Sequence, residues 1–277
     1  MSPTDVPIHK RLAAIGEQDN NLIIIGEAAL LLANLDLPNN SLSEYLTELD
    51  LIDTEISKLS LATDTLSTQI AILSEVIFKQ QGYHGDVESY DDPHNANLMR
   101  VIDRRKGLPV ALGILLIHTG RSQGWNITGI NFPGHFLLRL SQADEHAVIS
   151  PFDNAQQLNQ DDLQQLVTRV MGVQANLQPE FIQPISDRDV LIRLQNNIKV
   201  RALNASNPSR AIEVLESMSL IAPMSIAVLA ELALLETSEG YYQSALKRLD
   251  KFLERYSESE GAIHISNLKE KLKRHLN

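Results

Sequence analysis

His135 is the residue of this sequence best placed to do acid–base chemistry. It lies in the stretch INFPGHFLLRL, between a Pro-Gly turn and an apolar run that is typical of a β-strand. A histidine at the start of a strand can act as a general base when a nucleophile and an orienting group lie beside it. Two residues of the later segment ISPFDN, Ser150 and Asp153, are candidates for the orienting group. His135, Ser150 and Asp153 are therefore the candidate catalytic residues.

The thiol nucleophile that often accompanies such a histidine is missing. The chain contains no cysteine, which excludes a thiolate nucleophile, a disulfide and a zinc ion bound by cysteines. A histidine acting alone as general base accelerates a reaction only about 10²- to 10⁴-fold. An enzyme of this sequence would use His135 to activate water or a substrate hydroxyl. Asn131 and the backbone N–H groups of a helix that starts near Pro109 would then stabilise an oxyanion.

Histidines and carboxylates also permit a metal site. The candidate ligands are His84, His94 and His135 with Asp91 or Asp92. These histidines lack a close spacing such as H-x-x-x-H, which places two ligands on one face of a helix. We therefore expect no metal ligand set and no cofactor.

The elements that must position His135 form the middle of the chain. Residues 110–122 follow Pro109, which suits the first turn of a helix, and are apolar on nearly every face. They predict a buried central helix. Three short β-rich runs, WNITGINF, HFLLRL and HAVISPF, predict a small antiparallel sheet packed on that helix. The expected fold class is α+β, dominated by helices.

Helices are expected on both sides of this core. Residues 21–78 show apolar stripes with helical spacing, interrupted at Pro38. The segments PSRAIEVLESMSLIAP and YQSALKRLDKFLERYS align at a spacing of 34 residues, which is the tetratricopeptide period. We therefore expect three regions: N-terminal helices over residues 1–80, the core over 81–185 and tetratricopeptide-type helical repeats over 186–277.

Three motifs resemble those of a known family. They are Asp92-Pro93-x-Asn95, Arg104-Arg105-x-Gly107-x-Pro109 and Phe132-Pro133-Gly134-His135-Phe136. With EAALLLANLDLP and the C-terminal repeats, they make residues 20–277 similar to the SirB-type branch of transglutaminase-like proteins. The resemblance implies a papain-like core with a cysteine at the head of the central helix, a histidine at the start of a strand and an aspartate on the strand after it. The candidate binding residues are Asn131 and the motif residues Asp92, Asn95, Arg104, Arg105 and Pro109.

The triad that the resemblance implies is incomplete in this chain. The cysteine position falls at Pro109 or, after a shift of two residues, at Ala111, and neither side chain can attack a substrate. Ser150 occupies the aspartate position, and only His135 keeps its place. These replacements imply a degenerate, non-catalytic protein that acts as an interaction or regulatory module through a core pocket and its repeats. The alternative is a hydrolase or acyl-transfer enzyme that uses His135 as its general base.

Charge and composition limit the partners. The net charge of −11 disfavours nucleic acid and anionic membranes as partners, because both require a positive field on the protein. The longest apolar runs are shorter than the ~20 residues of a membrane span, and the N-terminus lacks the apolar segment of a signal peptide. We expect a protein or peptide partner, with basic or extended segments favoured, and a cytoplasmic location. The sequence leaves the oligomeric state open.

Overall fold

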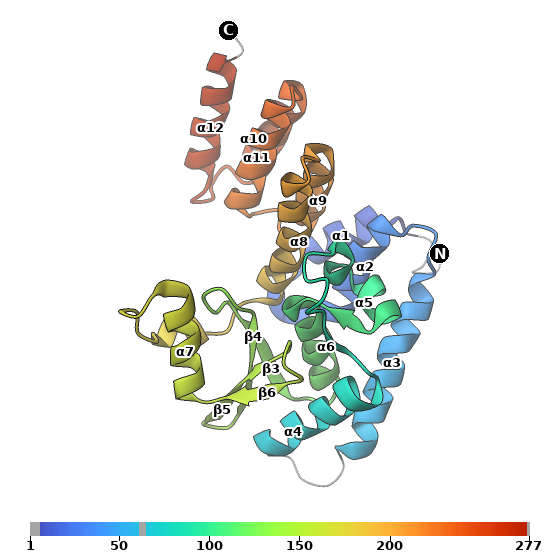
Figure 1. The fold of residues 1–277 in the computed structure, drawn as a ribbon. Coiled ribbons are helices and arrows are strands. Elements are labelled where there is room, and N and C mark those ends of the chain that lie inside the picture. Colours follow the sequence, from blue (N-terminus) through green and yellow to red (C-terminus); the bar gives the residue numbers. More distant parts are fainter. Residues whose placement is uncertain (1–5, 61–64, 276–277) are drawn as a thin grey trace. The chain divides into compact units, whose positions relative to one another are not determined.

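The computed structural model describes residues 6–60 and 65–275 and divides into two compact units (Figure 1). The main unit consists of residues 19–194. The C-terminal unit combines residues 1–18 with residues 195–277. None of the helices in the described ranges has the length and apolar character that crossing a bilayer requires.

A buried helix, α6 (Pro109–Ser122), forms the centre of the main unit. Pro109 occupies its first turn, where the missing N–H of a proline leaves no hydrogen bond unmade. Leu112, Ile114 and Leu116 are fully buried, as are the residues between them. The predicted central helix is therefore confirmed.

A four-stranded antiparallel sheet packs on α6 (Figure 1). Its strands lie in the order β3 (Asn126–Ile130), β4 (Leu137–Gln142), β5 (Glu145–Ser150) and β6 (Gln156–Leu158). The small antiparallel sheet is confirmed. Strand β6 was not predicted, because its three residues carry no alternating apolar pattern and join the sheet by pairing with β5.

Both faces of this sheet are covered, which explains why β4 does not alternate apolar and polar residues. Leu138 faces α6 close to Gly113. On the other face, Leu137 and Val148 pack against α7 (Gln160–Met171) in one apolar cluster. A strand buried on both faces reads as a nearly continuous apolar run.

Helices from the first third of the chain pack around α6. They are α2 (Ile25–Asp36), α3 (Leu42–Leu59), α4 (Leu66–Leu73) and the π-helix η3 (Ser74–Gln80), preceded by the short 3-10 helix η2 (Asn20–Leu22). Helix α2 is buried along most of its length and contacts α6 directly. It ends two residues before Pro38, as the sequence predicted.

The segment before α6 consists of short elements that hold the start of that helix in place. Strand β1 (His84–Gly85) pairs in parallel with β2 (Lys106–Gly107), which ends directly before Leu108 and α6. Between the two strands lie the 3-10 helix η4 (Pro93–Ala96) and α5 (Leu98–Arg104).

The C-terminal unit is made of helices. Helix α8 (Asp187–Asn204) begins in the main unit and ends in the C-terminal unit; it follows the 3-10 helix η5 (Pro179–Ile182). The helices after it are α9 (Pro208–Ile221), α10 (Ile226–Ser238), α11 (Tyr242–Arg255) and α12 (Ala262–His275). Each of α9 to α12 packs against the next.

Helix α1 (Ile8–Gly16) also belongs to the C-terminal unit and packs on α9. The helices approach so closely at Gly16 that an added Cβ atom would lie 2.1 Å from the carbonyl oxygen of Leu220. The two units thus divide the chain at other places than the regions 1–80, 81–185 and 186–277, and that three-region division stays a prediction.

Candidate functional site

A cavity of about 510 Å³ opens in the main unit at the N-terminal end of α6. We call it the core pocket. It is lined by Tyr90, Pro109, Gly134, His135, Phe136, Leu137, Ser150, Phe152, Asp153, Gln156, Leu158, Asp162, Gln165, Leu166 and Arg169. The cavity brings together Pro109 and the three candidate catalytic residues, which come from three separate segments of the chain. Their functional roles stay predictions.

The start of α6 offers no nucleophile to the core pocket. Pro109 lines the cavity with an unreactive ring. Ala111 is fully buried and lies outside the lining of the cavity. Because the chain also lacks cysteine, neither position can supply the thiolate of a papain-like enzyme.

His135 lies half-buried on the wall of the core pocket, two residues before β4. Burial lowers the pKa of its imidazole, and the nearby Arg169 and Arg193 lower it further, whereas the carboxylate of Asp153 raises it. The net shift is downward, so His135 is neutral at pH 7. A neutral imidazole in an open cavity can accept a proton or a hydrogen bond.

Ser150 and Asp153 bond to each other instead of to the histidine. The hydroxyl of Ser150, a buried side chain at the end of β5, donates to Asp153 Oδ2 over 2.7 Å. The chain bends sharply after β5 through Asn154 and Ala155, which both have left-handed backbones (φ 54° and 60°). This bend brings Asp153 to the core pocket. Across the described ranges, no hydrogen bond or ion pair joins the His135 ring to Ser150 or Asp153.

Arg193 of α8 holds the loop that carries His135. Its Nη2 donates to the backbone oxygen of His135 over 2.9 Å, and its Nη1 donates to Asn131 Oδ1. The guanidinium also lies 5.6 Å from the centre of the Phe136 ring. The Asn131 oxygen accepts the bond from Arg193, and Asn131 is exposed and outside the lining of the core pocket, so its Nδ2 amide group is not placed to donate to an oxyanion there.

The residues of the Asp92-Pro93-x-Asn95 motif form an ion cluster with Arg104. Arg104 Nη2 lies 3.0 Å from Asp92 Oδ2 and 3.2 Å from Oδ2 of the buried Asp86, and Nη1 donates to Asn95 Oδ1 over 3.1 Å. Lys106 Nζ also lies 3.0 Å from Asp86 Oδ2. None of these side chains lines the core pocket. This geometry gives Asp92, Asn95 and Arg104 a role in holding the 86–95 loop.

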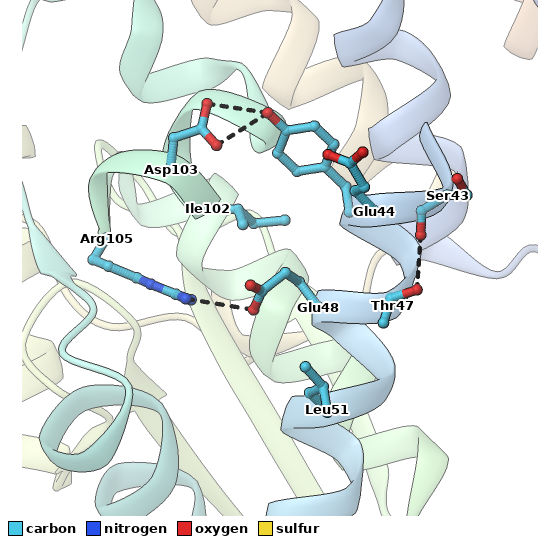
Figure 2. A pocket seen from close by; sticks show the side chains of 9 residues that line it. Ser43, Glu44, Thr47, Glu48, Leu51, Ile102, Asp103 and Arg105 are labelled. Carbon is cyan, nitrogen blue, oxygen red and sulfur yellow. Dashed lines mark hydrogen bonds and ion pairs between the residues drawn. The ribbon is translucent and has the colours of Figure 1, made fainter. Parts of the chain in front are cut away.

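Arg105 has contacts of its own. It ends α5 with a left-handed backbone (φ 57°), donates to the Tyr83 hydroxyl and lies 3.4 Å from Glu48. Burial raises the pKa of Tyr83 to about 12 despite this neighbouring cation, so the phenol stays protonated. Arg105 also lies apart from the core pocket and lines a second cavity (Figure 2).

The candidate metal ligands His84, His94 and His135 make separate contacts. His84 Nδ1 lies 3.1 Å from the carbonyl oxygen of Gly85, and His94 Nδ1 lies 2.8 Å from Asp92 Oδ1. His135 lines the core pocket. Over residues 6–60 and 65–275, no group of three or more histidines and carboxylates is arranged to hold a metal ion.

Sequence reasoning missed three residues of the site: Tyr90, Arg169 and Arg193. Tyr90 packs edge-on against Phe152, with ring centres 5.8 Å apart, and both rings line the core pocket. Arg169, on α7, forms no hydrogen bond or ion pair with any other described residue. Arg169 belongs to no motif of the sequence and so gives no signal, whereas Tyr90 lies only two residues before the Asp92 motif.

The ion cluster predicts how stability depends on pH. Burial by itself raises the pKa of Asp86, but the N–H of Ser89 and the ammonium of Lys106 outweigh it, and the net pKa is lowered. A carboxylate with a lowered pKa in the folded state contributes stability above its unfolded pKa of about 3.9, and this contribution disappears as the pH falls below that value. The free energy of unfolding, measured in urea, should therefore decrease steeply as the pH falls below about 4.

The Asp86→Asn variant should lose part of this acid dependence. The exposed Asp144, in the turn between β4 and β5, offers a matched control, and Asp144→Asn should keep the slope of the wild type. Equal slopes in Asp86→Asn and the wild type would show that the cluster does not contribute to acid unfolding.

Comparisons with known proteins show the family of this chain. A family model of the transglutaminase-like superfamily matches residues 43–196. This match spans more than half of the chain, and the protein belongs to the transglutaminase-like superfamily.

Individual relatives extend the similarity over most of the chain. The chain is 26% identical over 254 residues to a UPF0162 protein of Xylella fastidiosa, covering 91% of this chain and 89% of the relative. It is 35% identical over 119 residues to a UPF0162 protein of Vibrio cholerae, covering 43% of this chain and 44% of the relative. Over a shorter stretch of 81 residues, the chain is 32% identical to F-box only protein 21 of Mus musculus, covering 29% of this chain and 13% of the relative.

Proposed function

We propose that this transglutaminase-like protein is a SirB-type pseudoenzyme: a cytoplasmic, cofactor-free interaction or regulatory module that binds a protein or peptide. One observation carries the proposal. The core pocket keeps His135, but Pro109 lines the position from which a cysteine would attack, and the chain has no cysteine. A cavity of this size with aromatic walls can still bind a ligand without reacting with it.

The C-terminal helices supply the second binding surface of the proposal. The 34-residue spacing relates α9 to α11, and the paired positions Ala211 and Ala245 are both fully buried, which supports tetratricopeptide-type packing. The same spacing relates Val200 of α8 to Leu234 of α10, and these side chains are 47% and 51% exposed. A repeated exposed aliphatic position suits an extended peptide that runs across successive repeats.

Capture of partners in the native host tests this function. Tagged wild-type protein, His135→Ala and Leu234→Lys should be crosslinked in cells, purified and compared by quantitative mass spectrometry. We expect His135→Ala to keep the wild-type partner and Leu234→Lys to lose about 90% of it, since this change adds a charge to the apolar position. Ile263→Lys, at an aliphatic side chain of α12 that is 66% exposed, is the matched control and should behave as the wild type.

A second candidate function rests on the residues around His135. His135, Ser150 and Asp153 line one cavity, and the neutral imidazole can act as general base for water or a substrate hydroxyl. This hydrolase or acyl-transfer alternative predicts that the purified protein processes its captured partner and that His135→Ala lowers the rate at least about 100-fold. Processing of the captured partner by the wild-type protein, lost in His135→Ala while the partner is still bound, would contradict the interaction module and favour the enzyme.

A further inference from the structure

A second cavity, of about 590 Å³, lies between α3 and the end of α5 in the main unit (Figure 2). We call it the α3–α5 pocket. Glu44, Glu48 and Leu51 of α3 line one side, and Ile102, Asp103 and Arg105 line the other. It shares no lining residue with the core pocket.

The α3–α5 pocket has an apolar surface for a long aliphatic chain. The side chains of Tyr45 and Ile102 are buried beneath it, at 8% and 4% exposure. Leu51, in contrast, is 55% exposed, although it lies on the same helix as four buried hydrophobic residues. A methylene stem laid on Leu51 and Ile102 would remove this apolar area from water.

Carboxylates surround this apolar surface. The Glu44 side chain forms no hydrogen bond or ion pair with any other described residue. Asp103 accepts a hydrogen bond from the Tyr45 hydroxyl, at 3.0 and 3.1 Å to its two oxygens (Figure 2), and is 39% exposed. Burial raises the pKa of Tyr45, and the negative charge of Asp103 raises it further. The open end of the pocket therefore carries negative charge.

The one cation of the pocket does not cancel this charge. Arg105 reaches across to Glu48, with Nη2 3.4 Å from Glu48 Oε2 (Figure 2). Its guanidinium also lies 4.8 Å from the centre of the Tyr83 ring. Glu48 and Arg105 thus compensate each other, and Asp103 also lies 3.7 Å from Arg100 Nη1, whereas Glu44 forms no ion pair with any other described residue.

The charge of the whole main unit has the same sign. Residues 19–194 contain 23 acidic and 11 basic residues, whereas residues 195–277 contain 10 acidic and 11 basic ones. The excess negative charge of the protein therefore belongs to the unit that holds the α3–α5 pocket. Such a field attracts cationic segments and raises their association rate.

We infer that the α3–α5 pocket binds a lysine or arginine side chain of an extended basic peptide segment. The aliphatic stem lies on Leu51 and Ile102, and the cation lies between the carboxylates of Glu44 and Asp103. The inference does not depend on the proposed function, because it concerns a different cavity and makes no use of His135.

Fluorescence anisotropy with the purified full chain tests this inference. The probe is a fluorescein-labelled twelve-residue peptide of alternating Arg and Ala, and the matched peptide carries Glu in place of Arg. Glu44→Lys should weaken binding of the Arg peptide about 10-fold or more, because it removes one carboxylate and adds a repelling cation. Asp50→Lys makes the same charge change at an exposed residue of α3 outside the pocket, and should weaken binding less than about 2-fold. The Glu peptide should not bind.

A third variant, Leu51→Ser, tests the apolar part of the pocket without changing its charge. It should weaken binding of the Arg peptide about 3-fold, while the thermal unfolding of all three variants stays close to that of the wild type, since the substituted side chains are exposed. Equal losses in Glu44→Lys and Asp50→Lys would show attraction by the general field and overturn the inference. Unchanged binding in Glu44→Lys, or binding of the Glu peptide, would overturn it as well.

Discussion

Ile114→Asp should abolish cooperative folding of the main unit. Ile114 lies in the middle of α6 with 0% exposure, and this helix buries apolar side chains on every face. A carboxylate placed there has no partner, and burying an unpaired charge costs several kcal/mol. Domains of this size are stable by only about 5–15 kcal/mol. We expect the variant to lose its sharp thermal transition in circular dichroism and to be found largely in the insoluble fraction.

Ile114→Val provides the control for this position. It removes a single methylene and should lower the free energy of unfolding by only about 0.5–1.5 kcal/mol, with the cooperative transition retained. A soluble Ile114→Asp variant that melts cooperatively near the wild-type temperature would show that the centre of α6 is not buried.

The sequence predicts most of the core that surrounds this helix, for physical reasons. A helix that is apolar on all faces, such as α6, is buried in the protein interior, and Pro109 indicates where it begins. The strands β3, β4 and β5 carry β-branched and aromatic residues between turn signals. Strand β6 has neither signal, because Gln156 and Gln157 are held by backbone pairing with Ser150 and Ile149. Pairing of this kind depends on tertiary structure and leaves no periodic pattern.

The candidate site is predictable only in the residues that belong to motifs. The sequence indicates His135, Ser150, Asp153 and Pro109, and the chain brings all four to one cavity. Arg193 acts on His135 from 58 residues away in the sequence, on a helix with many other polar residues. Nothing local distinguishes such a side chain from an ordinary surface arginine.

The grouping of α1 with the C-terminal helices is unpredictable for the same reason. The sequence predicts an N-terminal region over residues 1–80, which stays a prediction, and it gives no sign that residues 1–18 group with residues 195–277. The contact depends on the missing side chain at Gly16, where α1 approaches Leu220 of α9. Lone glycines occur too often at helix ends for this one to indicate a contact so far along the chain.

Arg121→Ala is the second substitution with a large expected effect. Arg121, in the last turn of α6, forms a two-pronged ion pair with Asp187 at the start of α8: Nη1 donates to Oδ2, and Nη2 donates to Oδ1 over 2.9 Å. Its Nε also donates to the carbonyl oxygen of Ile127 over 3.0 Å. Asp187 is 5% exposed, so the variant leaves a buried carboxylate without its partner. We expect a loss of about 3 kcal/mol in the free energy of unfolding, measured in urea.

A double-mutant cycle separates the pair from the packing of the two side chains. Asp187→Leu alone leaves Arg121 without its carboxylate partner. Because Arg121 is 34% exposed and can be hydrated, Asp187→Leu should lower the free energy of unfolding less than Arg121→Ala does. Arg121→Met combined with Asp187→Leu removes both charges and leaves apolar groups of similar volume, and should cost less than the sum of Arg121→Met and Asp187→Leu measured separately. Additive losses in the cycle would show that Arg121 and Asp187 act independently, and that the start of α8 is held to the end of α6 by apolar packing alone.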